Sequence, residues 1–193
     1  MKAENVEHIE IFRDPGRYAG WPANYGMWSW GHEIVLAFTA GYPDPAGGFH
    51  ARDRSRPLVT MQARSVDGGV TWDVREGDMP HGVGLSAHEH MNEDVINDLP
   101  ALDFISPDGI DFTKPDSAIM CGRTGLREGA MSWFYWSPDR CQSWDGPFEF
   151  PMFGQRGLAA RTDVLVEDPR SAIFLLTSTV PSGDEGRVLV IRT

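Results

Sequence analysis

The sequence predicts an all-β fold built from repeated antiparallel sheets, and three observations carry that prediction. Residues 65–72 read Ser-Val-Asp-Gly-Gly-Val-Thr-Trp, and an imperfect copy at residues 137–144 reads Ser-Pro-Asp-Arg-Cys-Gln-Ser-Trp. A run rich in β-type residues precedes each copy. The chain also contains 21 Gly, 14 Pro and 7 Trp among 193 residues, a composition typical of many short strands joined by turns.

The pattern shared by the two copies, Ser-x-Asp-x-x-x-Ser/Thr-Trp, suits a tight hairpin. Asp67 can accept hydrogen bonds from the backbone N–H groups that follow it, while Gly68 and Gly69 tolerate a positive φ. Trp72 then supplies a large apolar anchor after the turn. In the second copy Cys141 replaces the glycine, so that turn must accept a strained residue or adopt another geometry.

Four strands are expected in a first round that surrounds the first copy. Residues 6–12 are mildly apolar and could form an edge strand before the turn residues at 14–16. Within the round, residues 34–38 are apolar enough to be buried on both faces. The expected strands are residues 23–30, 33–42, 58–64 and 73–75.

The same order of strands returns in two further rounds. Between the first and second rounds lies a polar stretch, residues 79–98, which we expect to be a crossing loop or a short helix. The second round is expected to have strands at residues 96–104, 117–121, 131–136 and 148–150. The third is expected to have strands at residues 158–166, 172–179 and 187–193.

Composition excludes several classes of partner. The formal net charge is −11, and no basic cluster offsets it, so a nucleic-acid partner is not expected. No window approaches the roughly 20 apolar residues of a membrane span, and the N-terminus lacks the apolar core of a signal peptide. We therefore expect a soluble chain, cytoplasmic by default, in which Cys121 and Cys141 are buried thiols.

The repeated hairpins resemble the Asp-box, also called the BNR repeat, of the sialidase (neuraminidase)-like superfamily. The segment Arg17-x-x-x-Trp21-Pro22 adds to this likeness. The resemblance implies one partial β-propeller domain over residues 1–193, with blades at about 17–76, 96–151 and 158–193. Its spacing places Thr193 at the first position of a third Asp-box, so we expect half of a six-bladed propeller, cut within its third blade. Assembly of two copies, through uncovered blade edges, is the alternative.

The resemblance also implies a site for the carboxylate of an acidic sugar. Family members bind it with arginines, one of which lies before a proline near the start of the first blade. Arg17 is the candidate, Arg13 is its rival, and a surface arginine in a turn is the alternative. Arg123 and Arg161 would face the shared channel as further substrate contacts, unless they serve structural pairing, with Asp163 for Arg161.

An acid/base aspartate of the family lies in the loop between the second and third strands of the first blade, here residues 41–57. Asp53 is the candidate and Asp44 is second, and a raised pKa would let such a group shuttle a proton. The arginines at 52, 54 and 56 would instead hold Asp53 ionised, and a solvated charged loop is the alternative. The family's nucleophilic tyrosine and its glutamate match no position in this chain.

His88-Glu89-His90 allows a metal site, but no third or fourth ligand has a recognisable spacing, so neither a metal nor another cofactor is expected. A place at the mouth of the channel makes His88 or His90 a candidate substrate contact. The resulting hypothesis is a sialidase-like glycoside hydrolase domain that acts on or binds an acidic sugar. The alternative is a non-catalytic propeller that binds carbohydrate or protein.

Overall fold

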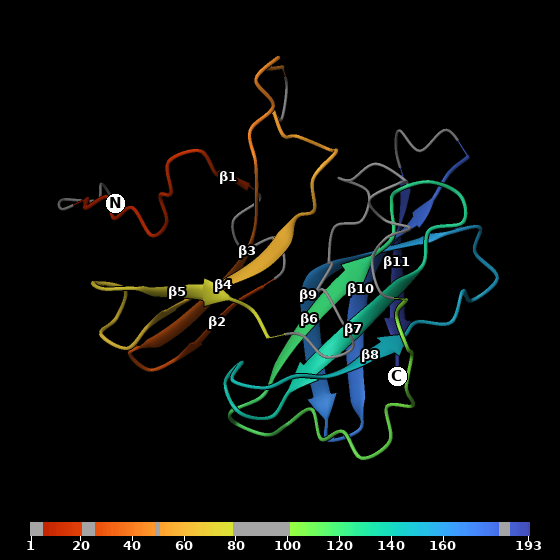
Figure 1. Ribbon diagram of the computed structural model, residues 1–193. Helices are drawn as coiled ribbons and strands as arrows, with labels where there is room; N and C mark the ends of the chain where they lie inside the picture. Colours follow the sequence, from red (N-terminus) through yellow and green to blue (C-terminus); the bar gives the residue numbers. More distant parts are fainter. Residues whose placement is uncertain (1–5, 21–25, 49–50, 79–100, 182–185) are drawn as a thin grey trace.

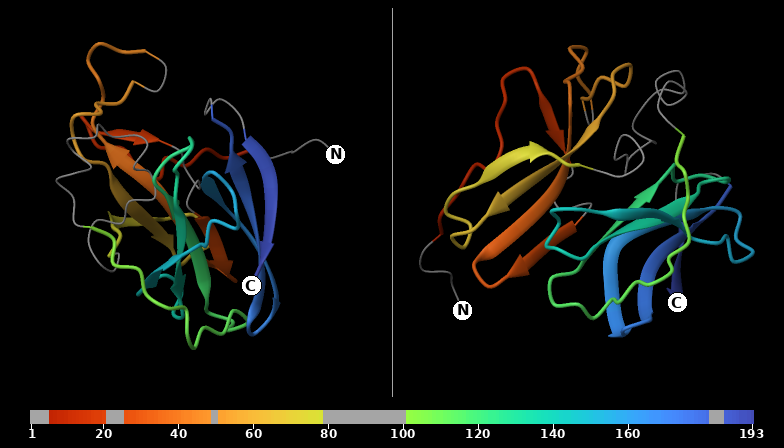
Figure 2. Two further views of the ribbon diagram at one scale, coloured as in Figure 1. Left: turned by 90° about the vertical axis from the view of Figure 1, so that its right-hand side faces the viewer. Right: turned by 60° about the horizontal axis from the view of Figure 1, so that its bottom comes forward.

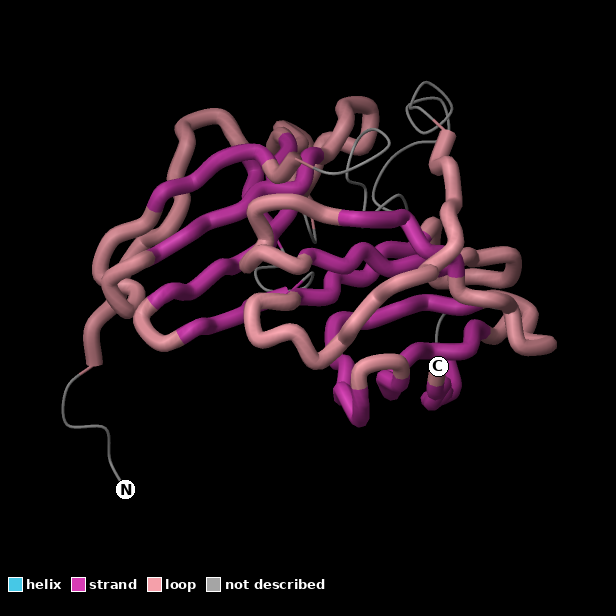
Figure 3. The backbone as a smooth tube through the Cα atoms, turned by 90° about the horizontal axis from the view of Figure 1, so that it is seen from below, coloured by secondary structure: helices cyan, strands magenta, loops and turns pink. Residues whose placement is uncertain are grey.

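The computed structural model describes residues 6–20, 26–48, 51–78, 101–181 and 186–193, without the side chains of residues 161–163. Every regular element in these ranges is a β-strand, and the strands form three antiparallel sheets in chain order (Figure 1). In Figure 3 the described residues are strands and loops. The predicted all-β class is therefore confirmed. No helix that could cross a membrane occurs in these ranges.

The first sheet is organised around β3, its longest strand. β1 pairs with the C-terminal half of β3 and β2 with the N-terminal half, both on the edge opposite β4. β5 then pairs with β4. The five strands are β1 (Tyr18–Gly20), β2 (Gly26–Trp30), β3 (Glu33–Gly41), β4 (Val59–Ser65) and β5 (Asp73–Glu76). The expected strands of the first round are confirmed within the described residues, and β1 is an addition to them.

Residues 6–12, considered as an edge strand, form no strand. Instead Ile11 and Phe12 pack against buried residues on the outer face of the first sheet. The rings of Phe12 and Phe38 lie 5.2 Å apart. Ile11 and Phe12 are thus partly buried by covering a sheet face, whereas Val6 and Ile9 are exposed, which a strand-like sequence pattern alone does not reveal.

The second sheet has three described strands, β6 (Ala118–Arg123), β7 (Ser132–Ser137) and β8 (Asp145–Glu149). A first strand was expected at residues 96–104, of which 96–100 lie outside the described residues and 101–104 form no strand. Leu102 and Phe104 pack against the buried cluster beside this sheet. The Phe104 ring lies 6.1 Å from Trp133. For residues 101–104 the strand expectation is wrong, because their apolar side chains fill the face of the sheet.

The third sheet agrees with the expected third round. Its strands are β9 (Leu158–Asp168), β10 (Ser171–Thr179) and β11 (Gly186–Arg192), with β10 in the middle. Alternation along β10 is regular: Phe174 and Leu176 are buried, while Ile173 and Leu175 on the other face are only partly covered.

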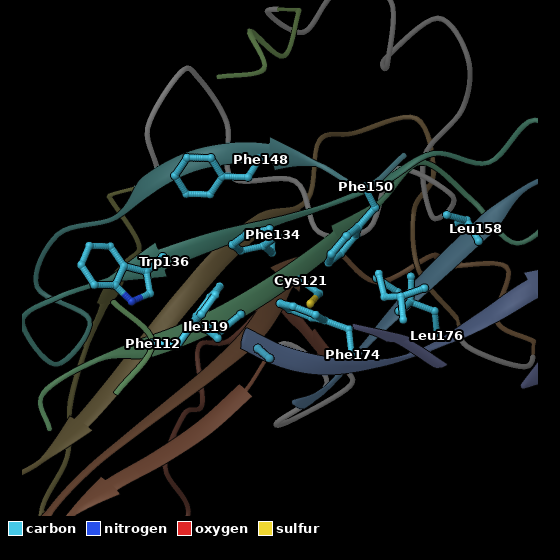
Figure 4. Close-up of a cluster of buried hydrophobic side chains, with 13 residues drawn as sticks. Phe112, Ile119, Cys121, Phe134, Trp136, Phe148, Phe150, Leu158, Phe174 and Leu176 are labelled. Carbon is cyan, nitrogen blue, oxygen red and sulfur yellow. The ribbon is translucent and has the colours of Figure 1, made fainter. Parts of the chain in front are cut away.

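The three sheets stack in sequence order (Figure 2). Val35 and Ala37 of β3 face the second sheet, whereas Leu36 and Phe38 face the outer cluster, as strand alternation requires. A cluster rich in phenylalanine joins the second and third sheets (Figure 4). At its centre the Phe134 ring lies 5.2 Å from Phe174.

The first hairpin, residues 65–72, is held by one carboxylate and one hydroxyl. Asp67 accepts hydrogen bonds from the backbone N–H groups of Val70 (3.0 Å) and Thr71 (2.9 Å), and from the Thr71 hydroxyl (2.6 Å). Ser65 Oγ donates to Asp67 and accepts from the N–H of Gly69, both at 2.8 Å. These bonds hold the pKa of Asp67 at about 2, with the Thr71 hydroxyl as the largest cause.

The second hairpin, residues 137–144, repeats this geometry despite its different residues. Asp139 accepts from the N–H of Gln142 (3.0 Å) and from the N–H and hydroxyl of Ser143 (2.8 and 2.6 Å). Ser137 Oγ accepts from the N–H of Cys141 at 2.8 Å. Arg140 and Cys141 have φ of 57° and 63°, so this turn keeps the left-handed conformation that the glycines favour in the first hairpin.

The second hairpin is also attached to the first sheet. Gln62 of β4, with its amide turned so that both ends are satisfied, donates to the Cys141 carbonyl (3.0 Å) and accepts from Trp144 Nε1 (2.9 Å). Trp144 is buried, and its ring lies 5.6 Å from Trp28. Each hairpin tryptophan therefore packs on the side of its sheet that faces the preceding part of the chain, Trp72 in the outer cluster and Trp144 against the first sheet.

Candidate functional site

Arg17 immediately precedes β1 and is fixed by the end of β3. Its backbone N–H donates to the Asp14 carbonyl (2.9 Å), which closes the turn before β1. Its Nε donates to the carbonyl of Gly41 (2.9 Å). The pairing of β1 with β3 thus places a half-buried guanidinium next to the residue that follows β3.

That residue is Tyr42, and two arginines gather on it. The guanidinium carbon of Arg17 lies 4.7 Å from the centre of the Tyr42 ring, and the guanidinium of Arg56 also stacks on the ring. Aromatic faces attract guanidinium groups, so Tyr42 offsets part of the repulsion between two neighbouring cations. Two guanidinium groups therefore lie at one end of the first sheet.

The loop between β3 and β4 folds back on itself to bring Arg56 to this position. Pro43 and Arg52 form a β-bridge, and the N–H of Asp53 donates to the Tyr42 carbonyl (2.8 Å). Asp44 Oδ1 accepts from the N–H of Ala46 (2.9 Å) and so helps to hold the far turn of the loop. The bridge prolongs the β3–β4 hairpin beyond the sheet and returns the chain beside Tyr42.

Asp53 is held as a carboxylate. Its Oδ1 accepts from the Ser55 hydroxyl (2.6 Å) and from the Ser55 N–H (2.9 Å). The hydroxyl bond, then the backbone bond and the charge of Arg56, hold the pKa of Asp53 below its usual range, although desolvation acts the other way. The shift is opposite in direction to the one expected of a proton donor and agrees with the alternative of an ionised aspartate.

These groups can bind an anion that carries hydroxyl groups next to its charge. Guanidinium groups donate in the planar fork that matches a carboxylate, and an ionised aspartate accepts hydrogen bonds from hydroxyls. Arg17 and Arg56 lie against the Tyr42 ring, and the backbone N–H of Asp53 donates to the Tyr42 carbonyl, so the site supplies both kinds of group.

Arg123 occupies a different place, between the second and third sheets. It ends β6 and is 3% exposed, and its Nη1 donates to the Ala160 carbonyl (3.2 Å). Nearby, Ser132 Oγ donates to the Leu158 carbonyl (2.7 Å) and accepts from the N–H of Ala160 (2.9 Å). The structure gives Arg123 a part in joining β6 to β9, and its contact with a substrate stays a prediction.

The other predicted contacts are less defined. Arg161 lies in β9, but its side chain is outside the described residues, as is the whole of His88. Arg13 is exposed, and its Nη1 lies 3.9 Å from Glu10 Oε2. Within the described residues, no group of three or more His, Cys, Asp or Glu side chains could hold a metal ion.

The site lies at the opposite end of the strands from the two hairpins. In an antiparallel sheet, the loop that enters β4 and the hairpin that leaves it must lie at opposite ends. Figure 1 shows the β3–β4 and β6–β7 loops in its upper half and both hairpins in its lower half. The hairpins therefore make no direct contribution to the groups around Tyr42.

Tyr42 and Arg56 were not predicted as site residues. The available signal was the alternation of charge in residues 52–56, together with a tyrosine directly after a buried strand. Comparison with protein-family models gives no match, and a search of curated proteins finds none that is significantly similar.

Proposed function

We propose that the three sheets are consecutive blades of a sialidase-like β-propeller, and that the chain binds an acidic sugar through its carboxylate at Arg17 and Arg56. The proposed binding rests on one observation: two guanidinium groups lie against the Tyr42 ring, at the end of the first sheet. A carboxylate accepts hydrogen bonds from such forks more readily than a neutral group does.

The two hairpins support the propeller. Both hairpins join the last two strands of a sheet in chain order, both use a serine and an aspartate in the same hydrogen bonds, and both pack a tryptophan towards the preceding part of the chain. Such repetition, with sheets packed face to face in chain order, is expected of blades in a propeller.

Binding without hydrolysis is favoured by the state of Asp53. A general acid must carry a proton near the working pH, whereas the bonds from Ser55 hold this carboxyl ionised. Its Oδ1 accepts two bonds from Ser55, which leaves Oδ2 to accept from a sugar hydroxyl. Hydrolysis with Asp53 as the acid/base group is the second candidate.

Titration calorimetry with free sialic acid and its methyl ester tests the proposal. The acid is expected to bind more tightly than the ester, because the ester lacks the charged carboxylate. Arg17→Ala and Arg56→Ala should each weaken binding of the acid by about 10- to 100-fold, the range for hydrogen bonds to charged groups. Arg75→Ala, on the exposed strand β5, is the matched control and should have no effect.

Equal affinity for the acid and the ester would contradict the proposal, as would wild-type affinity in both arginine variants. Arg17→Lys keeps the charge but loses the planar fork, so a weakened affinity in that variant shows that geometry matters. Release of a fluorescent aglycone from an aryl sialoside distinguishes hydrolysis from binding in the same samples.

A further inference from the structure

Strand β11 differs from the two strands that hold the same place in the other sheets. β4 pairs with β3 and β5, and β7 pairs with β6 and β8, so each of them has a neighbour on both edges. Within the described residues, β11 pairs with β10 alone. The backbone groups along its second edge offer a template for one more strand.

The end of β11 has the register of the strands that lead into hairpins. Ser65 pairs with the second residue of β3, and Ser137 pairs with the first residue of β6. The N–H of Thr193 donates to the carbonyl of Ala172 (3.1 Å), the second residue of β10, and its Oγ1 accepts from the N–H of Ala172 (2.9 Å). The residues of β11 can therefore be compared with those of β4 and β7 position by position.

In both of the other sheets, the segment that follows provides a Trp-Asp pair and then the last strand of the sheet, β5 or β8. The tryptophan, Trp72 or Trp144, packs in an apolar cluster beside the sheet. The aspartate, Asp73 or Asp145, begins this last strand and pairs with the residue just before the hairpin serine.

A pocket of about 950 Å³ lies where such a tryptophan would pack against the third sheet. Its apolar walls are Phe134 of β7, Phe112, Phe150 and Ile191 of β11 (Figure 4 shows the three phenylalanines). Phe153 also lines it and is 49% exposed. The volume lies within the roughly 300–1,000 Å³ of ligand pockets in proteins.

The charge at the edge of β11 also fits a segment that contains a Trp-Asp pair. Arg192 holds the position that Arg64 holds in β4, and the partner of Arg64 in β5 is Asp73. The Arg192 side chain is 65% exposed and binds Glu167 through Nε (2.7 Å) and Nη2 (2.9 Å), so a second carboxylate can still approach it from solvent. An incoming strand with aspartate after its tryptophan would place that carboxylate opposite Arg192.

From these observations we propose that the pocket and the second edge of β11 bind a polypeptide segment with a Trp-Asp pair followed by a short extended run. The indole enters the pocket, the aspartate faces Arg192, and the extended run pairs antiparallel with β11 as a fourth strand. The proposal does not depend on the binding of a sugar, since the pocket and the Tyr42 site consist of different residues.

A synthetic peptide that copies residues 66–76 of this chain tests the proposal, because that segment already performs this role beside β4. We expect the dye-labelled peptide to bind the full chain with an affinity measurable by fluorescence anisotropy. Trp72→Ala in the peptide should weaken binding at least tenfold, as expected for a buried aromatic anchor. Phe153→Ala in the chain, an exposed position, should weaken binding without unfolding the protein.

A charge exchange and a cross-link locate the peptide. Asp73→Lys in the peptide should reduce binding to the wild-type chain about two- to fivefold, and Arg192→Glu in the chain should restore it. A photo-reactive phenylalanine at the tryptophan position should cross-link to residues 107–112 or 150–153.

Three outcomes would overturn the proposal: no binding at about 1 mM peptide, equal binding of the Trp72→Ala peptide, or cross-links confined to β4. The last outcome would show that the peptide had displaced β5 in the first sheet.

Discussion

Arg140 Nη1 lies 2.8 Å from Glu33 Oε2, so a residue of the second hairpin is bound to the first residue of β3. Arg64 of β4 binds the other oxygen of Glu33, and Arg140 Nε lies 2.7 Å from Asp116. Trp30 Nε1 also donates to the Pro115 carbonyl (2.9 Å). These hydrogen bonds and ion pairs connect the first sheet to the second, beside the apolar cluster that joins the two sheets.

Removing the charge of Glu33 should weaken this junction. Glu33→Gln is expected to lower the free energy of unfolding by about 1–3 kcal/mol at neutral pH, because two arginines lose a charged acceptor. Urea unfolding followed by tryptophan fluorescence measures the change. Glu76→Gln, on exposed β5, is the control. Equal losses in the two variants would show that the junction contributes nothing specific.

The stabilising effect of Glu33 should also depend on pH. The hydrogen bond from Arg140, ahead of that from Arg64, holds the pKa of Glu33 below its usual range despite desolvation. A lowered folded-state pKa stabilises the protein above the unfolded value of about 4.3 and loses that effect as pH falls through the folded value. The stability difference between wild type and Glu33→Gln should therefore be constant above about pH 5 and shrink in more acidic solution.

The lowered pKa of Asp67 predicts a second loss of stability in acid, at a lower pH than the loss expected for Glu33. Its pKa of about 2 lies below the unfolded value of about 3.9, so its stabilising effect is complete above about pH 4 and disappears towards pH 2. Asp67→Asn should melt at a lower temperature than wild type at pH 7, and the melting temperatures should converge as pH falls to about 2. Thermal denaturation across this range would contradict the prediction if the gap stayed constant.

Both thiols should be inert in the folded protein. Burial raises the pKa of Cys121 to about 12 and also raises that of Cys141. The thiolate that reacts with disulfide reagents is then scarce, on the order of 1 part in 10,000 for Cys121 at pH 8. We expect reaction with an aromatic disulfide only after denaturant unfolds the chain. Rapid reaction of either thiol in native buffer would contradict its buried position.

Ser55 should control the ionisation of Asp53. Ser55→Ala removes the hydroxyl donor, the largest cause of the lowered pKa, and leaves the backbone N–H donor in place. The pKa of Asp53 should therefore rise, which carboxyl carbon NMR titration can follow. Ser143→Ala, beside Asp139 in the second hairpin, serves as a control that leaves Asp53 unchanged. An unaltered Asp53 titration in Ser55→Ala would exclude the assigned cause.

The hairpins and most strands were predictable because their signals are local. A serine, an aspartate two residues on, and a tryptophan fix one turn whatever surrounds it, and strand alternation shows in neighbouring residues. The second hairpin tolerates Cys141 in a left-handed conformation because Ser137 and Asp139 still supply the same bonds. The sequence left that point open.

The site and the covering segments were less predictable because they depend on distant parts of the chain. Phe104 covers a sheet and packs near the ring of Trp133, which lies 29 positions later in the sequence. The meeting of Arg17 and Arg56 on Tyr42 requires both the β1–β3 pairing and the folded-back loop. The lowered pKa of Asp53 follows from Ser55, whose proximity in sequence was a usable signal.

The serial order of the three sheets has a consequence for how the protein unfolds. The most extensive strand contacts between sheets in the described residues are β6 with β9, β7 with β9 and β2 with β6, and each includes a strand of the second sheet. Such an array behaves like a short chain of nearest neighbours, in which each unit is stabilised by the interfaces beside it. The middle sheet, with two interfaces, should exchange its amide protons last, and cooperative unfolding of the whole molecule should depend on its integrity.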